Sequence, residues 1–310
     1  MRPSQGAGVR PMKVAVIGLG SMGMGAAQNL LKKGHEVVGV EPREAVRAAF
    51  VAEGGAAVAR PSGLPAGLEA VVVFVVNAAQ TTDVLFGADG CAGLLPQGAV
   101  VLCCTTVAPE FARALETKLA ERGLSLLDAP VSGGAGAARG GTMTVMASGP
   151  EAAFAKAQPV LDAVAGKVWR LGEAAGVGST VKMVNQLLAG VHIATAAEAI
   201  ALGIRAGADP QTLYDVITTS AGNSWMFQNR VPHILAGDDT PLSAVNIFVK
   251  DLGIVLDQAR ALSFPLPMAS AAHQLFLGAA AAGHGPKDDA FVIRVWEALA
   301  GIKLPTKAGE

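Results

Sequence analysis

Short apolar segments typical of strands alternate with helical segments as far as Leu171, and no convincing strand follows Gly176. The strand-like segments include Lys13–Ile17, Glu36–Val40 and Ala70–Val76. Alternation of this kind predicts a doubly wound, mostly parallel sheet that is covered by helices on both faces. We therefore expect an α/β domain at the start of the chain and an all-helical domain at its end.

The predicted domain boundaries are residues 12–174 and 175–305, joined by a long helix over Ser179–Ala206. A length of 310 residues fits two domains. The remaining predicted strands of the first domain are Ala99–Cys103, Leu124–Leu127, Thr142–Ala147 and Lys167–Arg170. Its predicted helices are Met22–Lys33, Arg43–Ala52, Pro109–Arg122 and Glu151–Val164. The further predicted helices of the second domain are Pro210–Ser220, Ser224–Ala236, Ser243–Leu262, Pro267–Ala282 and Pro286–Ala300.

Composition excludes several classes of protein. Hydrophobic residues make up 51% of the chain and charged residues 16%, a balance that a disordered chain does not have. The 24 basic and 25 acidic residues nearly cancel, which argues against a nucleic-acid partner. Neither the three cysteines nor the five scattered histidines have metal-ligand spacing, so we expect no metal site and no disulfide framework.

The mean hydropathy of +0.43 is high enough that a membrane span has to be considered. The best candidate, Leu187–Gly207, is interrupted by His192, Glu198 and Arg205, which favours a buried central helix over a membrane helix. No secretory signal is visible, and Met1–Pro11 is predicted to be a frayed leader. The expected location is the cytoplasm.

The segment GLGSMG, Gly18–Gly23, is a G-x-G-x-x-G that follows a predicted strand and opens a predicted helix. Gly18 permits a tight turn, Gly20 lets a pyrophosphate approach the backbone, and Gly23 lets the helix pack closely on the strand. The helix N-terminus offers N–H groups to the phosphates. This pattern predicts a dinucleotide-binding Rossmann domain.

Glu41 ends the second predicted strand, where an acidic side chain can reach the ribose 2′-hydroxyl of a dinucleotide. A carboxylate there would repel the 2′-phosphate of NADP, so Glu41 favours NAD. Arg43 weakens this preference, because its guanidinium could pair with such a phosphate. We expect NAD as the cofactor, with NADP less favoured.

Two further segments carry groups suited to chemistry. In Asp128–Thr142, the run Ser132–Gly133–Gly134 offers a hydroxyl and consecutive backbone N–H groups that suit a carboxylate, although an ordinary glycine-rich loop between strands explains it equally well. In Gly176–Leu188, Lys182 and Asn185 are three residues apart and project from the same helix face. Lys182 on an apolar helix is either a desolvated base with a depressed pKa or a lysine whose amine reaches solvent, and its position alone does not separate the two.

These motifs resemble those of the β-hydroxyacid dehydrogenase superfamily. The resemblance extends from about Val14 to Pro305. It rests, in the family order, on GLGSMGMG, TTVAP (Thr105–Pro109), DAPVSGG, GSTVKMVNQ and FVKDLG (Phe248–Gly253). Within the superfamily, the L-threonate dehydrogenase subgroup shares runs similar to VVNAAQ (Val75–Gln80), NQLLAGVHIA (Asn185–Ala194) and SAGNSWMFQNRVPH (Ser220–His233).

The resemblance implies roles for individual residues. Lys182 would be the general acid/base, and Ser132, Gly133, Gly134 and Asn185 would hold the substrate. Thr106 and Lys250 would approach the nicotinamide, with Asp251 beside Lys250. The residues that would hold the rest of the cofactor are Gly18, Leu19, Gly20, Ser21, Met22, Gly23 and Glu41.

The implied activity is transfer of hydride between a small hydroxy acid and NAD, with oxidation of L-threonate at its 2-hydroxyl as the first choice. The alternatives are a 3-hydroxyisobutyrate dehydrogenase, a tartronate or succinic semialdehyde reductase, and a nucleotide-binding scaffold that has lost the chemistry. The apolar helical domain predicts a homodimer or homotetramer.

Several other residues have less specific patterns. Trp225, Phe227 and Arg230 could line a cleft, but the default expectation for the Trp and the Phe is the core. The subgroup resemblance also implies, more weakly, that Asn223 and Ser224 are neighbours of the substrate. The acidic pair Asp238–Asp239 and the run Lys287–Asp289 are predicted to be solvated surface.

Overall fold

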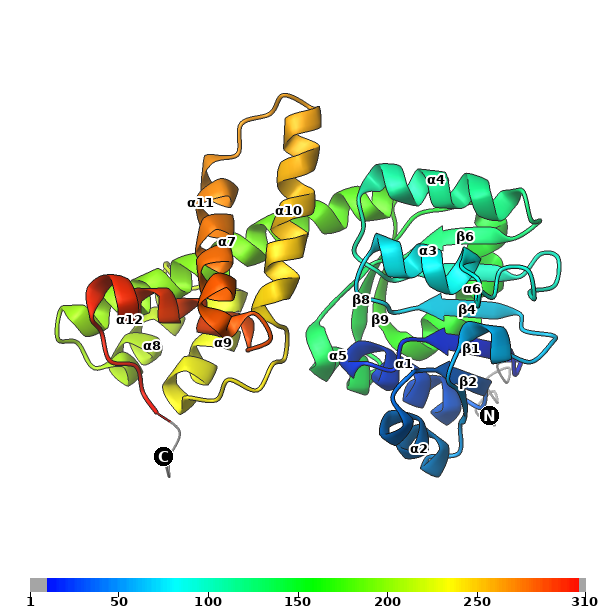
Figure 1. Ribbon diagram of the computed structural model, residues 1–310, viewed down its shortest axis with the longest axis horizontal. Helices are drawn as coiled ribbons and strands as arrows, with labels where there is room; N and C mark the ends of the chain where they lie inside the picture. The colour runs from blue at the N-terminus through cyan, green and yellow to red at the C-terminus, as the bar shows by residue number, and fades with distance from the viewer. Residues whose placement is uncertain (1–9, 307–310) are drawn as a thin grey trace, which may run out of the picture. The chain divides into compact units, whose positions relative to one another are not determined.

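The computed structural model describes residues 10–306, and the chain divides into two compact units, Met1–Lys182 and Met183–Glu310 (Figure 1). The predicted boundary falls between residues 174 and 175, whereas the compact units divide inside a long helix, α7 (Val177–Arg205). The predicted leader Met1–Pro11 lies outside the described residues except for its last two positions.

The first unit is built on a six-stranded sheet in the order β3–β2–β1–β4–β5–β6, in which every pairing is parallel. The strands are β1 (Lys13–Ile17), β2 (Glu36–Val40), β3 (Ala56–Val58), β4 (Ala70–Val73), β5 (Val100–Cys103) and β6 (Ser125–Asp128). The strand order reverses between β1 and β4, and ligands bind outside the carboxyl ends of strands at such a reversal. The predicted doubly wound parallel sheet is confirmed.

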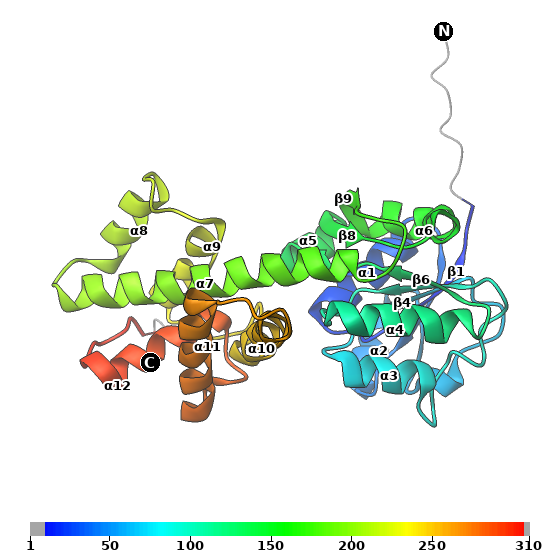
Figure 2. The same cartoon turned by 90° about the horizontal axis from the view of Figure 1, so that it is seen from above.

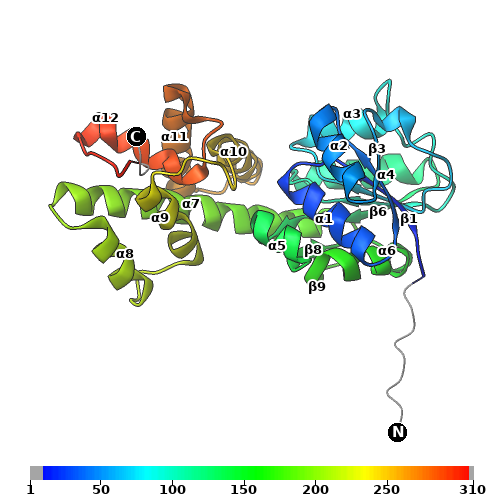
Figure 3. The same cartoon turned by 90° about the horizontal axis from the view of Figure 1, so that it is seen from below.

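Helices cover both faces of this sheet (Figure 2 and Figure 3). Val14 and Val16 of β1 belong to one core cluster with α1 (Ser21–Lys32) and α6 (Glu151–Val164). Ala15 and Ile17 belong to the opposite cluster, with α3 (Ala78–Phe86) and α4 (Pro109–Ala120). Because successive side chains of a strand point to opposite faces, a continuous apolar run such as that of β1 is stable only when both faces are buried. The helix α2 (Glu44–Ala52) and the 3-10 turn Pro61–Gly63 complete the connections between strands.

Three strands lie outside the main sheet and form one of their own. β7 (Val131–Ser132) pairs antiparallel with β8 (Met143–Ala147), which pairs parallel with β9 (Ala165–Arg170). A helix, α5 (Gly134–Gly140), connects β7 to β8. The alternative explanation of this segment as an ordinary glycine-rich loop therefore does not hold for much of it.

Contacts with α1 explain why the glycine-rich segment forms a helix. A Cβ atom at Gly25 would lie 2.6 Å from the carbonyl carbon of Ala138, so the two helices meet backbone to backbone. The Nδ2 group of Asn29 donates to the carbonyl oxygens of Ala138 (2.7 Å) and Arg139 (3.2 Å). At the end of α5, these bonds give the carbonyl of Arg139 a partner and add to the one long bond (3.4 Å) that the carbonyl of Ala138 accepts from the N–H of Gly141. The stabilising partner lies more than 100 residues away in the sequence, where local composition gives no sign of it.

The sequence did contain a signal for α3, which was not predicted. Asn77 precedes the helix and accepts a hydrogen bond from the backbone N–H of Gln80 (2.9 Å). The side chain of Gln80 accepts in turn from the N–H of Val76 (2.9 Å). This reciprocal pattern resembles a capping box, which marks a helix start.

The described part of the second unit is helical, as predicted, and contains no strand. After α7, its elements are α8 (Pro210–Thr218), α9 (Trp225–Ala236), α10 (Val245–Ala261), α11 (Pro267–Ala279) with a π-helical turn (Ala280–His284), a 3-10 helix (Asp289–Arg294) and α12 (Val295–Ala300). The core contains Ile193 and Ile200 of α7, and the rings of Phe248 and Phe276 stack with centroids 5.2 Å apart. The single helix predicted over Pro286–Ala300 is instead a 3-10 helix followed by α12.

By length and composition, α7 is the one helix in the described residues that could cross a membrane. Several of its apolar residues, among them Ala197 and Ile200, are fully buried in the core of the second unit. A central helix of a globular domain passes the same test of length and composition, and this packing favours that interpretation.

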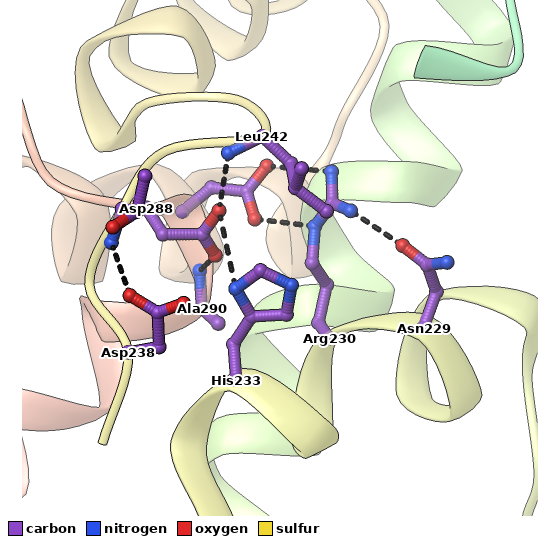
Figure 4. Close-up of polar contacts among 9 residues, drawn as sticks. Asn229, Arg230, His233, Asp238, Leu242, Asp288 and Ala290 are labelled. Atoms are coloured by element: carbon purple, nitrogen blue, oxygen red, sulfur yellow. Dashed lines mark hydrogen bonds and ion pairs between the residues drawn. The ribbon is translucent and has the colours of Figure 1, made fainter. Parts of the chain in front are cut away.

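Two buried aspartates correct the prediction for Lys287–Asp289, in which only Lys287 has a solvated side chain, at 45% exposure. Arg230 of α9 donates to both carboxylate oxygens of Asp289, at 2.6 Å and 3.1 Å, and Asp289 has no exposed surface. Asp288 is equally buried and accepts from the backbone N–H groups of Leu242 (2.8 Å) and Ala290 (3.1 Å) (Figure 4). A local run of charged residues is normally solvated, but here backbone and guanidinium donors compensate for the loss of water.

Of the two core positions predicted on α9, one is buried and the other is exposed. Phe227 is buried, as expected, but the side chain of Trp225 is 61% exposed, so the expectation of a core position is wrong for Trp225. Ser224 serves as the N-cap, accepting from the N–H of Phe227 (3.0 Å).

Candidate active site

The turn between β1 and α1 is built from glycines at closely packed positions. Gly18 has a φ of +90°, and its N–H donates to the carbonyl of Val40 at the end of β2 (2.9 Å). A Cβ atom at Gly23 would lie 1.8 Å from the carbonyl oxygen of Gly18, which leaves no room for any side chain. The helix can begin against the strand end only because both positions are glycine.

Gly20 lies in a different environment. A Cβ atom there would meet nothing within 4 Å, so the backbone is open on that side. Gly20 is the N-cap of α1, with no side-chain hydrogen bond to the first turn, and that turn contains no acidic residue. An α-helix N-terminus in this state presents N–H donors and a positive dipole end, which suit a phosphate group.

The carboxylate of Glu41 closes this turn from the neighbouring strand. It is 3% exposed and accepts a hydrogen bond from the N–H of Leu19 (3.2 Å). Arg43 donates to it through Nε (2.7 Å) and Nη2 (3.0 Å). This guanidinium lowers the pKa of Glu41, so the side chain is ionised at neutral pH. Arg43, which we considered as a partner for a 2′-phosphate, is paired with Glu41 here.

Thr106 is half-buried in the segment between β5 and α4. Its neighbour Thr105 is buried, with its hydroxyl 3.3 Å from that of Thr81 in α3. The thiol of Cys103 lies just before them, and burial raises its pKa to about 12. A thiol that stays protonated at neutral pH is a poor nucleophile, so chemistry at this strand end does not come from Cys103.

Ser132, Gly133 and Gly134 lie at the junction of β7 and α5 rather than in a loop. Ser132 is half-buried as the last residue of β7, and both glycines are exposed. Gly133 and Gly134 have φ values of +121° and +67°, a region that favours glycine. The structure therefore places the hydroxyl of Ser132 next to exposed backbone.

The carboxylate of Asp128 ties the end of β6 to the start of α7. It accepts from the N–H groups of Gly176 and Ser179, both at 2.9 Å, and from the Ser179 hydroxyl at 2.7 Å. The hydroxyl of Ser148 lies 3.4 Å from the same carboxylate and accepts from the N–H of Gly178 (2.9 Å). We refer to Asp128, Ser148 and Ser179 as the α7 anchor. Burial raises the pKa of Asp128, and these donors oppose that rise.

Lys182 follows the anchor by one helical turn and is 7% exposed. Its position combines the two features that a lysine acid/base needs, which are desolvation and a fixed backbone. The low exposure shows that the Lys182 side chain does not extend into solvent. Nothing in the sequence indicated that the three residues of the α7 anchor lie together. Asp128 and Ser179 nevertheless both belong to motifs that were identified in the sequence.

In the second unit, four polar residues form one chain of hydrogen bonds. Asn185 Nδ2 donates to Gln186 Oε1 (3.0 Å), and Gln186 Nε2 donates to Asp251 Oδ2 (2.5 Å). Lys250 Nζ donates to Asp251 Oδ1 (2.5 Å). Asn185 and Lys250, two of the predicted site residues, are thereby connected through Gln186 and Asp251. Sequence reasoning missed Gln186, although it lies four residues after Lys182 and so on the same face of α7.

Comparisons with known proteins agree with this organisation. Residues 13–172 match the family described as the NAD binding domain of 6-phosphogluconate dehydrogenase. Residues 176–296 match the family described as NAD-binding of NADP-dependent 3-hydroxyisobutyrate dehydrogenase. The chain belongs to the 3-hydroxyisobutyrate dehydrogenase-like superfamily. It is a hydroxy-acid dehydrogenase that uses a nicotinamide dinucleotide.

Three relatives place the chain within this superfamily. An L-threonate dehydrogenase of Cupriavidus necator is 58% identical over 95% of this chain and 98% of its own length. A 3-hydroxyisobutyrate dehydrogenase of Pseudomonas aeruginosa is 35% identical over 85% of this chain and 90% of its own. A crystal structure from Salmonella typhimurium, described as a 3-hydroxyisobutyrate dehydrogenase, is 51% identical with a TM-score of 0.88, covering 92% of this chain and 99% of that one. The superfamily that the motifs suggested is confirmed, and with it a small hydroxy acid as substrate.

Proposed function

We propose that this dehydrogenase oxidises L-threonate at its 2-hydroxyl with NAD. The observation that supports this most strongly is the 58% identity to the L-threonate dehydrogenase of Cupriavidus necator over 95% of the chain, against 35% to the 3-hydroxyisobutyrate dehydrogenase of Pseudomonas aeruginosa. The other L-threonate dehydrogenases that match, from Pectobacterium atrosepticum and Haemophilus influenzae, are each 52% identical over 95% of the chain, which supports the same substrate.

The environment of the glycine turn fits a dinucleotide. The open backbone at Gly20 would take the pyrophosphate, with Gly18, Leu19, Ser21, Met22 and Gly23 forming the rest of the turn. The ionised carboxylate of Glu41 would accept from the ribose hydroxyls and repel a 2′-phosphate, so we propose NAD rather than NADP. Thr106 and Lys250 would approach the nicotinamide.

We assign the acid/base role to Lys182. During oxidation its neutral amine would accept the proton of the 2-hydroxyl, and during reduction its ammonium would return that proton to the same oxygen. Ser132, Gly133 and Gly134 would hold the substrate carboxylate through the hydroxyl and backbone N–H groups, and Asn185 would orient the substrate. Bound NAD supplies the hydride acceptor.

The Salmonella typhimurium structure motivates a second candidate, because a 51% identical protein is described as a 3-hydroxyisobutyrate dehydrogenase. Initial rates with L-threonate, D-erythronate, 3-hydroxyisobutyrate and glycerate, each with NAD and with NADP, separate the candidates. We expect the highest kcat/KM with L-threonate and NAD. A higher value with 3-hydroxyisobutyrate would replace our proposal by the second candidate, and reduction of tartronate or succinic semialdehyde would indicate a reductase.

Replacing Lys182 tests the mechanism. Lys182→Ala should lower kcat by about two to four orders of magnitude, because general acid–base catalysis contributes about 10²–10⁴-fold. NAD affinity, measured by protein fluorescence or calorimetry, should change little. Lys33→Ala, at an exposed lysine, is the control and should leave kcat unchanged. Undiminished turnover in Lys182→Ala would contradict the assignment, and a wild type that binds NAD but oxidises no hydroxy acid would support the scaffold alternative.

We propose further that the enzyme acts in the cytoplasm as a homodimer or homotetramer. Helices of the second unit expose large apolar side chains, including Leu202 (69%), Leu262 (71%) and Met268 (65%). Exposed apolar surface of this kind favours association. A single species of monomer mass by light scattering at micromolar concentration would contradict the oligomer.

A further inference from the structure

The hydrogen-bond chain Asn185–Gln186–Asp251–Lys250 has a fixed direction. Asp251 is 2% exposed and contacts the ammonium of Lys250, so its carboxylate is held as a hydrogen-bond acceptor. Gln186, which is 8% exposed, can bond to this carboxylate only through its NH₂ group. The amide oxygen of Gln186 therefore has to point the other way, toward Asn185.

The orientation of the Gln186 amide also fixes the orientation of the Asn185 amide. Because Gln186 presents Oε1, Asn185 must present Nδ2 to it, which is the bond observed at 3.0 Å. Rotating either amide by 180° would place two acceptors or two donors against each other. The orientation of an amide is assigned from its hydrogen-bond network, and here a buried ion pair sets that network. Asn185 is half-buried, and its Oδ1 lies on the side of the amide away from Gln186.

We propose that this chain makes Asn185 Oδ1 an acceptor for a hydroxyl group of the substrate other than the one that is oxidised. The inference rests on the proposed function and specifies its substrate class as polyhydroxy acids. Gln186 and Asp251 are positioning residues, which act through Asn185. A hydroxyl can donate to Oδ1, whereas a carboxylate or a methyl group cannot, so a substrate that lacks the second hydroxyl leaves Oδ1 unpaired.

An unpaired acceptor has a measurable consequence. A site built to bond a hydroxyl disfavours the analogue that lacks it, because its own polar group is left without a partner after water is displaced. Wild type should therefore prefer L-threonate over 2-hydroxybutyrate, which keeps the reacting hydroxyl and the carboxylate but lacks the other two hydroxyls. We expect a ratio of kcat/KM values of about 10–100 or more.

The test measures this ratio at saturating NAD in the wild type and in variants. In Asn185→Ala, kcat/KM for L-threonate should fall about 10–100-fold while the value for 2-hydroxybutyrate changes much less, so that the ratio collapses. In Asp251→Asn the residue at 251 can donate as well as accept, so both amides can reverse, and the ratio should fall although Asn185 is intact. Asp257→Asn makes the same chemical change on the exposed side of α10, where Asp257 pairs with Arg260, and should leave the ratio unchanged.

The outcomes separate the alternatives. An equal loss for both substrates in Asn185→Ala, or an unchanged ratio in a folded Asp251→Asn, would overturn the proposal. If Asp251→Asn does not fold, judged by circular dichroism and NAD binding, Asn185→Ala decides alone, because its half-buried side chain can be truncated with little effect on the core.

If the wild type does not oxidise L-threonate, the proposed function fails first. If its best substrate in the panel is 3-hydroxyisobutyrate, which has no second hydroxyl, the present inference is overturned as well. If the best substrate is D-erythronate or glycerate, the same ratio is measured between that substrate and its analogue without the additional hydroxyl, and a ratio near one overturns the present inference separately.

Discussion

The two units differ in how their functional polar residues are distributed along the sequence. In the first unit they follow strand ends: the glycine turn after β1, Glu41 after β2 and Asp128 at the end of β6. In the second unit the buried polar partners come from distant helices, since Arg230 and Asp289 are 59 residues apart and Gln186 and Asp251 are 65 apart.

The reason for the difference is topological. In a parallel sheet the carboxyl ends of all strands lie on one edge, so a polar residue just after an apolar strand is placed near others of its kind. A helix repeats every 3.6 residues and does not indicate which neighbouring helix its polar face will meet. The polar residues that lie near one another can therefore be predicted from strand ends in the first unit. In the second unit motifs point to single residues such as Asn185 and Lys250, but which polar residues meet follows from the packing.

The strongest test of this comparison is the buried ion pair of the second unit. Arg230→Leu should destabilise that unit by about 3–5 kcal/mol, because it leaves the carboxylate of Asp289 buried without its guanidinium. Urea unfolding followed by circular dichroism measures the loss. Arg260→Leu removes the arginine of an exposed pair and should cost less than about 1 kcal/mol.

The same variant should show a dependence on pH. Burial raises the pKa of Asp289 to about 6, above the 3.8 of an ordinary aspartate, so in the wild type this group lowers stability as pH rises from about 4 to 6. Without Arg230 the native pKa rises further, and the loss of stability continues above pH 6. The difference between variant and wild type should therefore be larger at pH 8 than at pH 5. An equal difference at both pH values would contradict the ion-pair interpretation.

A smaller effect is expected at the α7 anchor in the first unit. Asp128→Ala leaves the N–H groups of Gly176 and Ser179 without their acceptor, at a cost of about 1–3 kcal/mol. Because Lys182 lies one turn further along α7, kcat should fall about tenfold or more while NAD affinity is retained. Ser148→Ala removes fewer of these bonds and should have a weaker effect on both stability and kcat. Unchanged turnover in Asp128→Ala would show that the anchor stabilises α7 without positioning Lys182.

The smallest effect concerns the exposed partner of Glu41. The side chain of Arg43 is 63% exposed, so Arg43→Gln should change stability by less than about 1 kcal/mol. Loss of this cation should reduce the use of NADP relative to NAD by a few-fold, whereas Glu41→Gln, which releases Arg43, should increase it. The ratio of kcat/KM values for the two cofactors measures both changes. Improved use of NADP in Arg43→Gln would contradict this account.

The fold was largely predictable, and two of the exceptions share a cause, whereas α3 was missed although Asn77 and Gln80 signal its start locally. The parallel sheet and the all-helical second unit follow from local apolar patterns. The helix α5 was missed because its stability depends on Asn29 and Gly25 of α1, which no local pattern in the glycine-rich segment reveals. Asp288 and Asp289 were predicted to be exposed because their donors, including Arg230, lie elsewhere in the sequence.

The sequence by itself determined most of the strand-and-helix order, the glycine turn and the superfamily, because each depends on residues that are close together or in a fixed order along the chain. It also identified Lys182 and Asn185 as neighbours on one helix face, which the helical repeat alone guarantees. It did not show α3, α5, β3 or β7. Only the tertiary structure decided that Lys182 is buried, that Arg43 pairs with Glu41, and that Asp251 sets the direction of the amides of Gln186 and Asn185. Desolvation and hydrogen-bond direction are properties of surroundings assembled from distant segments, so they are decided when those segments pack together.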